Sequence, residues 1–279
     1  FTSVTVTSDV QFAENISILP AILSGGANPP SLMPILCDIY EPTGDSVINR
    51  PVVILAHTGS FLPQVINGQP TGDKTDFSIV EQCTRWAKKG YVAVAMNNRL
   101  GWNPTSTDQD VRTSTLIQAA YRGIQDAKAM VRFLRKTEDI DGNPYGIDPN
   151  KIALGGQGTG GYISLGYATL DTVGDITPWQ EIYGLAKFIN LSTMFPYVYV
   201  PWYGNYDGTD STWLPDSAFG QAISPTGQIE LWNVPNWPNY SNDINFAFNV
   251  GGCLADSSWL EQGDVPIVSF HCTNDPYGP

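Results

Sequence analysis

The stretch KIALGGQGTGGYISLGYA, residues 151–168, contains the clearest structural signal in the sequence. It opens with a short apolar run, continues through closely spaced glycines and ends with the apolar spacing of a helix. A strand, a tight turn and a helix in this order are typical of α/β folds with a parallel sheet. Since ligand sites in such folds lie at the carboxyl ends of the strands, we expect a functional site at this turn.

Two further apolar runs predict strands of the same sheet. PVVILA (51–56) and YVAVAM (91–96) are short and continuously apolar, which is typical of parallel strands covered on both faces. Helical spacing is found in residues 76–90, which end at a candidate C-capping glycine, and in the longer segment 113–137. This alternation predicts a mostly parallel, doubly wound sheet with right-handed crossovers.

Two other parts of the chain, the N-terminal residues and the segment 196–243, have different sequence patterns. Residues 3–14 and 33–42 alternate apolar and polar side chains, which predicts antiparallel N-terminal strands. Residues 196–243 are rich in Trp, Tyr, Pro, Gly and Asn with little periodicity, so we expect a lid or an interaction insertion there. We expect a single domain over residues 1–279. Because the chain stops just after the apolar run VPIVSF (265–270), we also expect its C-terminal end to be truncated.

The chain is strongly acidic, with 14 Lys and Arg against 27 Asp and Glu and a formal net charge of −13. Such a surface repels phosphate groups, which argues against nucleic acids and anionic membranes as partners. No apolar run approaches the ~20 residues of a membrane span. Few lysines, abundant Asn, Thr, Trp and Tyr, and the sequons at Asn15, Asn190 and Asn239 are compatible with a secreted or cell-surface protein.

Cysteine and histidine are too scarce for a zinc site or a disulfide scaffold, and we expect no metal and no cofactor. Cys253 and Cys272 each lie near the end of a candidate strand, so they could form a disulfide or remain buried free thiols. The spacing of the carboxylates in residues 139–148 suggests a calcium-binding loop. Because glycine falls at the wrong place for an EF-hand loop, Asx-turn chemistry explains this segment better.

Three loops follow three of the predicted parallel strands. They are AHTGSF (56–61), GQGTGG (156–161) and FHCTNDP (270–276). Because the carboxyl ends of parallel strands meet at one edge of a sheet, we expect these loops to converge there. The glycine-rich loop is a poor phosphate-binding loop, since it lacks the Lys-Ser/Thr ending and follows a later strand than the first.

The ordered motifs resemble the α/β-hydrolase superfamily, in particular its secreted bacterial carboxylesterase/lipase-like members. HTGSF (57–61) is similar to the oxyanion loop His-Gly-Gly-Ser/Gly-Phe. Residues 145–162 match the nucleophile elbow, Gly-x-Ser-x-Gly, except that glycine stands at position 158. Residues 264–279 resemble the strand and loop that present the catalytic acid. The resemblance extends from about Pro34 to the end of the chain, interrupted by the aromatic insertion.

The resemblance implies an α/β-hydrolase fold and an ancestral serine-dependent hydrolysis of acyl esters. Carried over by position, Gly158 stands at the nucleophile and Asp275 is the acid that would orient a histidine. The backbone N–H groups of Thr159 and of Gly59 or Ser60 would form the oxyanion hole. The side chains expected to contact substrate are those of His57, Phe61 and Gln157.

Two catalytic groups are missing from this pattern. Gly158 has no side chain to attack a carbonyl, although glycine tolerates the strained elbow backbone without penalty. The catalytic histidine should follow the acid, yet His57 belongs to the oxyanion motif and His271 precedes Asp275. The hydroxyl of Thr159 is a poor replacement for the serine as nucleophile, because it lies one residue after the nucleophile position. We therefore expect negligible ester hydrolysis from the chain as written.

A different class of function stays open. Glycine at position 158, Thr58 in the oxyanion loop, Cys272 in place of a glycine and the aromatic insertion all favour a non-catalytic extracellular module. Such a module would bind a small-molecule ester or a carbohydrate-like ligand, or it would assemble with a protein partner through the insertion.

Overall fold

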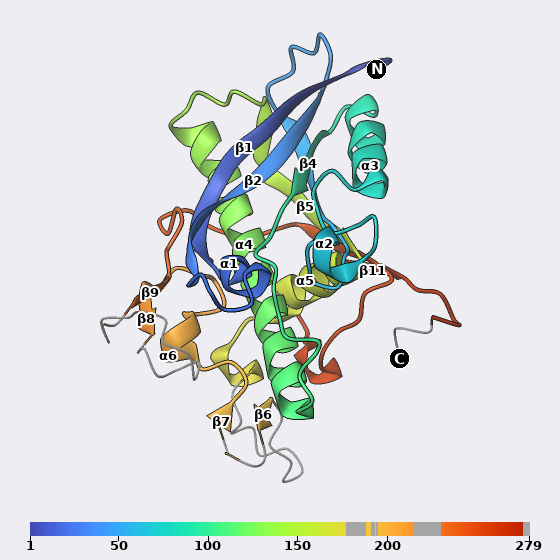
Figure 1. Cartoon of the computed structure of the whole chain (residues 1–279). Helices are drawn as coiled ribbons and strands as arrows, with labels where there is room; N and C mark the ends of the chain where they lie inside the picture. The colour runs from blue at the N-terminus through green and yellow to red at the C-terminus, as the bar shows by residue number, and fades with distance from the viewer. Residues whose placement is uncertain (177–187, 191–192, 194, 215–229, 276–279) are drawn as a thin grey trace.

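The computed structural model describes residues 1–176, 188–190, 193, 195–214 and 230–275. Its centre is a seven-stranded sheet with the order β1-β2-β4-β3-β5-β10-β11 (Figure 1). β1 and β2 are antiparallel to their neighbours, whereas β4, β3, β5, β10 and β11 run parallel. The predicted mostly parallel sheet with antiparallel N-terminal strands is confirmed. The strands are β1 (Val4–Ser17), β2 (Ser31–Pro42), β3 (Arg50–Ala56), β4 (Val92–Met96), β5 (Ile147–Gln157), β10 (Phe246–Val250) and β11 (Ile267–Phe270).

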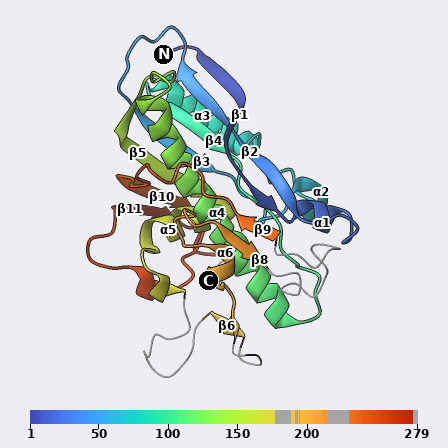
Figure 2. The same ribbon diagram turned by 90° about the vertical axis from the view of Figure 1, so that its left-hand side faces the viewer.

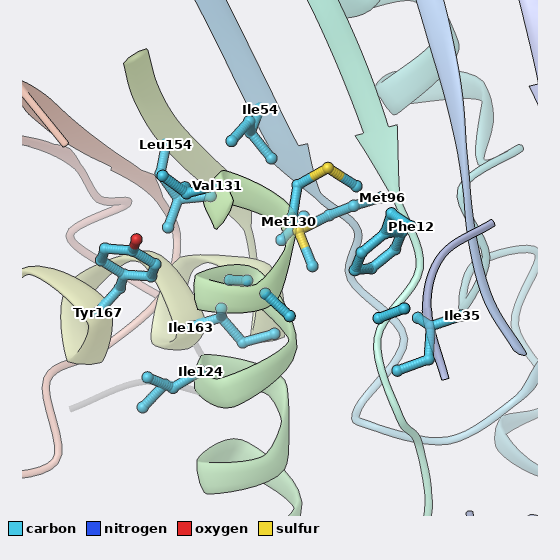
Figure 3. Close-up of a cluster of buried hydrophobic side chains, with 14 of the residues drawn as sticks. Phe12, Ile35, Ile54, Met96, Ile124, Met130, Val131, Leu154, Ile163 and Tyr167 are labelled. Carbon is cyan, nitrogen blue, oxygen red and sulfur yellow. The ribbon is translucent and has the colours of Figure 1, made fainter. Parts of the chain in front are cut away.

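Helices cover both faces of the sheet. On one face lies α3 (Phe77–Lys88), and on the other lie α4 (Gln109–Asp139) and α5 (Thr159–Thr169). Alternate side chains of β3 divide between the faces: Ile54 packs with the α4 and α5 side, and Leu55 with the α3 side. Figure 3 shows side chains of the first core, with Ile54 and Leu154 of the sheet facing Met130 of α4. This two-sided burial is why β3 and β4 have continuously apolar sequences.

α4 is longer and more deeply buried than its sequence pattern predicts. The expected helix over residues 113–137 is Gln109–Asp139, and its second half is buried almost all round. Arg99 and Asp126 form a buried ion pair at this helix, with 2.8 Å between Nε and Oδ1. Arg132 donates hydrogen bonds to the carbonyl oxygens of Asn236 and Asp207. A second layer of chain therefore covers the helix face that an amphipathic pattern assigns to solvent.

That second layer comes from the predicted aromatic insertion. Its described part contains α6 (Val200–Tyr203), β8 (Thr212–Leu214) and β9 (Glu230–Asn233), which lie beside α4 in Figure 2. Gln125 of α4 donates hydrogen bonds to the carbonyl oxygens of Tyr203 and Asn205, and Lys128 pairs with Asp207 at 2.8 Å. Residues 215–229 of the expected 196–243 insertion lie outside the described part, so its role as a lid stays a prediction.

Short elements complete the described chain. The remaining helices and strands are α1 (Leu19–Leu23), α2 (Gln64–Asn67), β6 (Ile189–Asn190), β7 (Phe195–Pro196) and the 3-10 turns Val173–Asp175 and Ser257–Trp259. Within the described residues, no helix is long and apolar enough to cross a membrane. All four cysteines are free thiols. Cys253 is partly buried and Cys272 is exposed, and the two do not form the disulfide that the sequence left open.

Candidate active site

The three loops converge as predicted at the carboxyl edge of the parallel strands. They surround a cavity of about 430 Å³, to which each of the three loops contributes lining residues. β3, β5, β10 and β11 all end beside it. Two predicted site residues from the elbow, Gln157 and Gly158, line this cavity together with the predicted acid Asp275. The other lining residues are Thr58, Val250, Gly251, Phe270, His271 and Cys272.

Gly158 has the backbone of a sharp strand-to-helix elbow. Its φ of 53° and ψ of −117° lie in a region that side chains rarely adopt, as we expected for this position. Its N–H donates to the carbonyl oxygen of Val250 at 2.9 Å, which ties the turn to β10. The turn is also too tight for a side chain at Gly156, where a Cβ atom would stand 2.0 Å from the carbonyl oxygen of Gly160. The glycines of this stretch are therefore required by the close approach of strand and helix.

The side chain of Thr58 occupies the space beside Gly158. A Cβ atom built on Gly158 would stand 2.2 Å from Thr58 Oγ1 and 3.1 Å from Thr58 Cβ. Real Cβ atoms essentially never approach another heavy atom below 3.0 Å. The Thr58 hydroxyl therefore fills the place where the side chain of an elbow nucleophile would begin. The sequence identified both departures from the family pattern but gave no signal that they touch.

The oxyanion loop is tightly folded around backbone of positive φ. Gly59, Ser60 and Phe61 have φ values of 116°, 57° and 53°. A Cβ atom on Gly59 would stand 2.5 Å from the Cα atom of Gly72, so only glycine fits there. Trp102 donates from Nε1 to the carbonyl oxygen of Ser60 at 2.7 Å. Neither Gly59 nor Ser60 is among the residues that line the cavity, and their oxyanion role stays a prediction.

Two residues expected to contact substrate point into the protein instead. His57 is 1% exposed and Phe61 3% exposed, and neither lines the cavity. His57 Nδ1 lies 2.6 Å from the carbonyl oxygen of Thr58, while its buried Nε2 has no hydrogen-bond partner among the described residues. Burial lowers the pKa of His57, which favours its neutral form. Phe61 belongs to the hydrophobic core, so its predicted substrate contact gains no support from its position.

The remaining predicted residues lie at the turn and on the last loop. Thr159 is the first residue of α5, where helix N–H groups have no acceptor within the helix, but it does not line the cavity. Gln157 lines the cavity, and its buried Oε1 has no hydrogen-bond partner among the described residues. Asp275 is partly buried and lies close enough to Tyr162 of α5 to influence it. The pKa of Tyr162 is raised to about 12, first by burial, then by a hydrogen bond with Cys253, and also by the charge of Asp275.

His271 lines the same cavity on the loop that carries Asp275. It is exposed and comes four positions before the acid in the sequence. Within the part of the chain that the structure describes, no group of three or more His, Cys, Asp or Glu side chains is arranged to hold a metal ion. The cavity therefore combines an elbow backbone, a hydroxyl, an amide, a thiol, an imidazole and a carboxylate.

The structure is similar to solved esterase structures. Thermogutta terrifontis esterase 2 phosphorylated by paraoxon is 15% identical with a TM-score of 0.48, and the match covers 88% of this chain and 68% of that chain. The butyrate-bound form of Est2, a thermophilic esterase from the same species, is 16% identical with a TM-score of 0.48, covering 88% and 70% of the two chains. No curated protein sequence matches the chain.

The family comparison covers the first two of the three converging loops. The BD-FAE family model matches residues 37–182, slightly more than half of the 279 residues. This segment includes the oxyanion loop, the buried helix α4 and the elbow with Gly158. The chain therefore belongs to the BD-FAE family, an esterase-like family of the α/β-hydrolase superfamily.

Proposed function

We propose that this chain is a catalytically silent member of its family, which binds a small ester-like ligand in the 430 Å³ cavity without cleaving it. The contact between Thr58 and Gly158 carries the proposal. Acyl transfer begins when a nucleophilic side chain attacks the carbonyl carbon of the ester. Gly158 offers no such atom, and the Thr58 hydroxyl takes up the room in which one would stand.

The histidines of the chain give this proposal further support. A catalytic base must reach the nucleophile, and an acid must orient the base. His57 is buried with its Nδ1 against the carbonyl oxygen of Thr58, so it is not available for proton transfer in the cavity. His271 and the free thiol of Cys272 do line the cavity, but both lie on the loop after β11 and not at the elbow, where the nucleophile of an esterase of this type stands.

Several features suited to ligand binding are retained. The cavity volume lies within the range of small-molecule sites. Val250 and Phe270 offer apolar contacts, while Gln157 and Thr58 offer polar ones. The amino terminus of α5 adds a positive end of a helix dipole behind Gly158, which favours a carbonyl oxygen or a carboxylate. These features support recognition of an ester group rather than its hydrolysis.

Assembly with another protein at the cell surface is the second candidate function. Phe195 and Trp213 of the aromatic insertion are 42% and 51% exposed. Exposed aromatic side chains of this kind are typical of surfaces that bind another protein. This candidate requires a location outside the cell, in keeping with the composition of the chain. Detection of the native protein in the culture medium or on intact cells tests that location, and its confinement to the cell interior contradicts it.

The test of silent binding combines kinetics with mapping of the ligand. The native full-length gene product is expected to hydrolyse p-nitrophenyl butyrate no faster than buffer. Added phenyl acetate is expected to shift the backbone amide NMR signals of Thr58, Gly158 and His271 without being consumed. Hydrolysis above the uncatalysed rate contradicts the proposal, and so does binding that shifts only signals remote from this cavity.

A further inference from the structure

A second cavity, of about 300 Å³, lies between the first turns of α4 and the aromatic insertion. One wall is formed by α4, and the other by residues of β7, α6 and the turn that joins them. In Figure 1 these elements gather near the lower end of α4. None of its lining residues lines the first cavity, so the two sites are separate.

Aromatic rings form the insertion side of this second cavity. Phe195, Tyr199 and Trp202 contact one another in a cluster, with ring centroids 5.1, 5.4 and 5.0 Å apart. Phe195 is 42% exposed, so the cluster is open to solvent rather than sealed in the core. The faces of such rings carry partial negative charge and attract cations, most strongly when the ring is a tryptophan.

The only charge in the described lining is negative. Asp110 lies in the first turn of α4, and its carboxylate is close to the hydroxyl of Tyr197, whose pKa is raised first by burial and then by the charge of Asp110 and a hydrogen bond with it. Arg112, the nearest basic residue along the helix, is not part of the lining. Its guanidinium instead donates to the carbonyl oxygen of Ser106 and to the side-chain oxygen of Gln109. With a formal net charge of −13 on the chain, the site attracts a positively charged ligand.

Three polar side chains on the α4 wall of the cavity, those of Ser114, Thr115 and Gln118, donate internal hydrogen bonds. Thr115 Oγ1 donates to the carbonyl oxygen of Val111 at 2.7 Å, and Gln118 Nε2 donates to the carbonyl oxygen of Tyr197 at 2.8 Å. A sugar ring needs several unengaged hydrogen-bond partners to replace its lost water. A methylated ammonium group needs only ring faces and a countercharge, so the arrangement favours it over a sugar.

We propose that this cavity is a binding site for a small organic cation of the quaternary ammonium class. Its methylated head lies against the rings of Tyr199 and Trp202, and Asp110 balances its charge. The proposal concerns a different cavity from the one beside Gly158, so it holds whether or not the chain hydrolyses esters.

Calorimetric titration of the native full chain with two probes tests the proposal. Choline carries the trimethylammonium head, and 3,3-dimethylbutan-1-ol has the same shape without charge. Choline is expected to bind at least about tenfold more tightly, because only the cation interacts with the ring faces and the carboxylate. Equal affinities for the two probes, or no choline binding up to about 10 mM, overturn the proposal.

Matched variants locate the site. Asp110→Asn keeps an acceptor for Tyr197 but removes the charge, and Trp202→Phe keeps a ring in the cluster but weakens its attraction for cations. Each is expected to lower choline affinity at least about fivefold while leaving the affinity of the neutral alcohol unchanged. The controls are Asp139→Asn at the other end of α4, where the carboxylate accepts a hydrogen bond from the hydroxyl of Tyr240, and Trp213→Phe on β8, whose side chain is exposed. Equal losses in the controls, or binding of methyl glucoside in place of choline, overturn the proposal.

Discussion

Thr58 Oγ1 lies 2.2 Å from the point at which a Cβ atom on Gly158 would stand. Thr58 comes from the loop after β3 and Gly158 from the turn after β5, two strands that pair in parallel. Both positions differ from the family pattern. Thr58 has a side chain where the oxyanion loop has a glycine, and Gly158 lacks the side chain of the elbow serine. Their contact means that the two substitutions must be considered as one structural change.

A stability cycle measures this coupling. Gly158→Ala is expected to lower the free energy of unfolding by about 2–5 kcal/mol, because it adds backbone strain and a clash with Thr58. In a Thr58→Gly background, the same change should cost only the strain, about 1–3 kcal/mol. Urea denaturation of the four proteins gives the coupling energy.

Gly25→Ala is the matched control for this cycle. Gly25 has a φ of 63°, and a Cβ atom there would meet nothing within 4 Å. Its replacement should therefore cost the same in both backgrounds. Additive effects of the Thr58 and Gly158 changes would show that the two residues do not compete for space.

Restoring the serine alone should not restore an esterase. In Gly158→Ser the new side chain meets Thr58, so we expect no gain in p-nitrophenyl butyrate hydrolysis over the native chain. Any gain should require Thr58→Gly as well, since this second change opens the space that the serine needs. A Gly158→Ser variant that is active by itself would contradict the steric argument.

The buried pair Arg99–Asp126 is expected to be essential for the fold. Their side chains are 3% and 2% exposed, and Asp126 also accepts the N–H of Arg99 at 2.6 Å. Asp126→Ala leaves a buried guanidinium without its carboxylate, which should cost about 3–5 kcal/mol of unfolding free energy. The loss is measured by urea denaturation.

The exposed pair Arg85–Glu81 on α3 serves as the control for that comparison. Its side chains are 72% and 44% exposed at a distance of 2.7 Å. Glu81→Ala should cost at most about 1 kcal/mol, since solvent screens such pairs. If Asp126→Ala and Glu81→Ala lowered the free energy of unfolding by similar amounts, burial would not determine how much an ion pair contributes to stability.

Stability should decline as the pH falls below the ordinary pKa of histidine because of His57. Burial lowers the pKa of His57 in the folded chain below its ordinary value of 6.5. The unfolded chain then binds a proton that the folded chain rejects, so the stabilisation is present above pH 6.5 and is lost as the pH falls. At pH 5.5 the loss from this group is at most about 1.4 kcal/mol, measured by urea denaturation at both pH values.

The chain contains only two histidines, which makes the control simple. His57→Gln should flatten the dependence of stability on pH between pH 7 and 5.5. His271→Gln changes an exposed side chain and should leave that dependence as in the native chain. Asp73, whose pKa is lowered from 3.8, titrates below this window and does not disturb it. An unchanged slope in the His57 variant would assign the effect to other groups.

The local sequence was sufficient to predict most strands of the central sheet, the helices α3, α4 and α5, and the convergence of three loops, but not the short strands β6, β7, β8 and β9. Apolar runs identify β3 and β4 because both of their faces are buried, and the glycines around Gly158 identify the turn because no side chain fits there. These signals are local, so they can be read without knowing the neighbours of each strand. The candidate cavity was predicted for the same reason, from the ends of parallel strands.

Only the tertiary structure decided which side chains reach the cavity. His57 and Phe61 belong to a motif associated with substrate, yet the tight loop turns both into the protein. The second half of α4 is buried almost all round because the aromatic insertion also covers it, which no periodicity within the helix can reveal.

The pairing of β3 with β5 sets Ala56 beside Gly156, and two residues further along each strand Thr58 meets Gly158. A contact of this kind depends on strand order and register, which are properties of the assembled sheet. Sequence alone therefore determined that glycine stands at position 158 of the turn, and the tertiary structure decided that the side chain of Thr58 lies beside it.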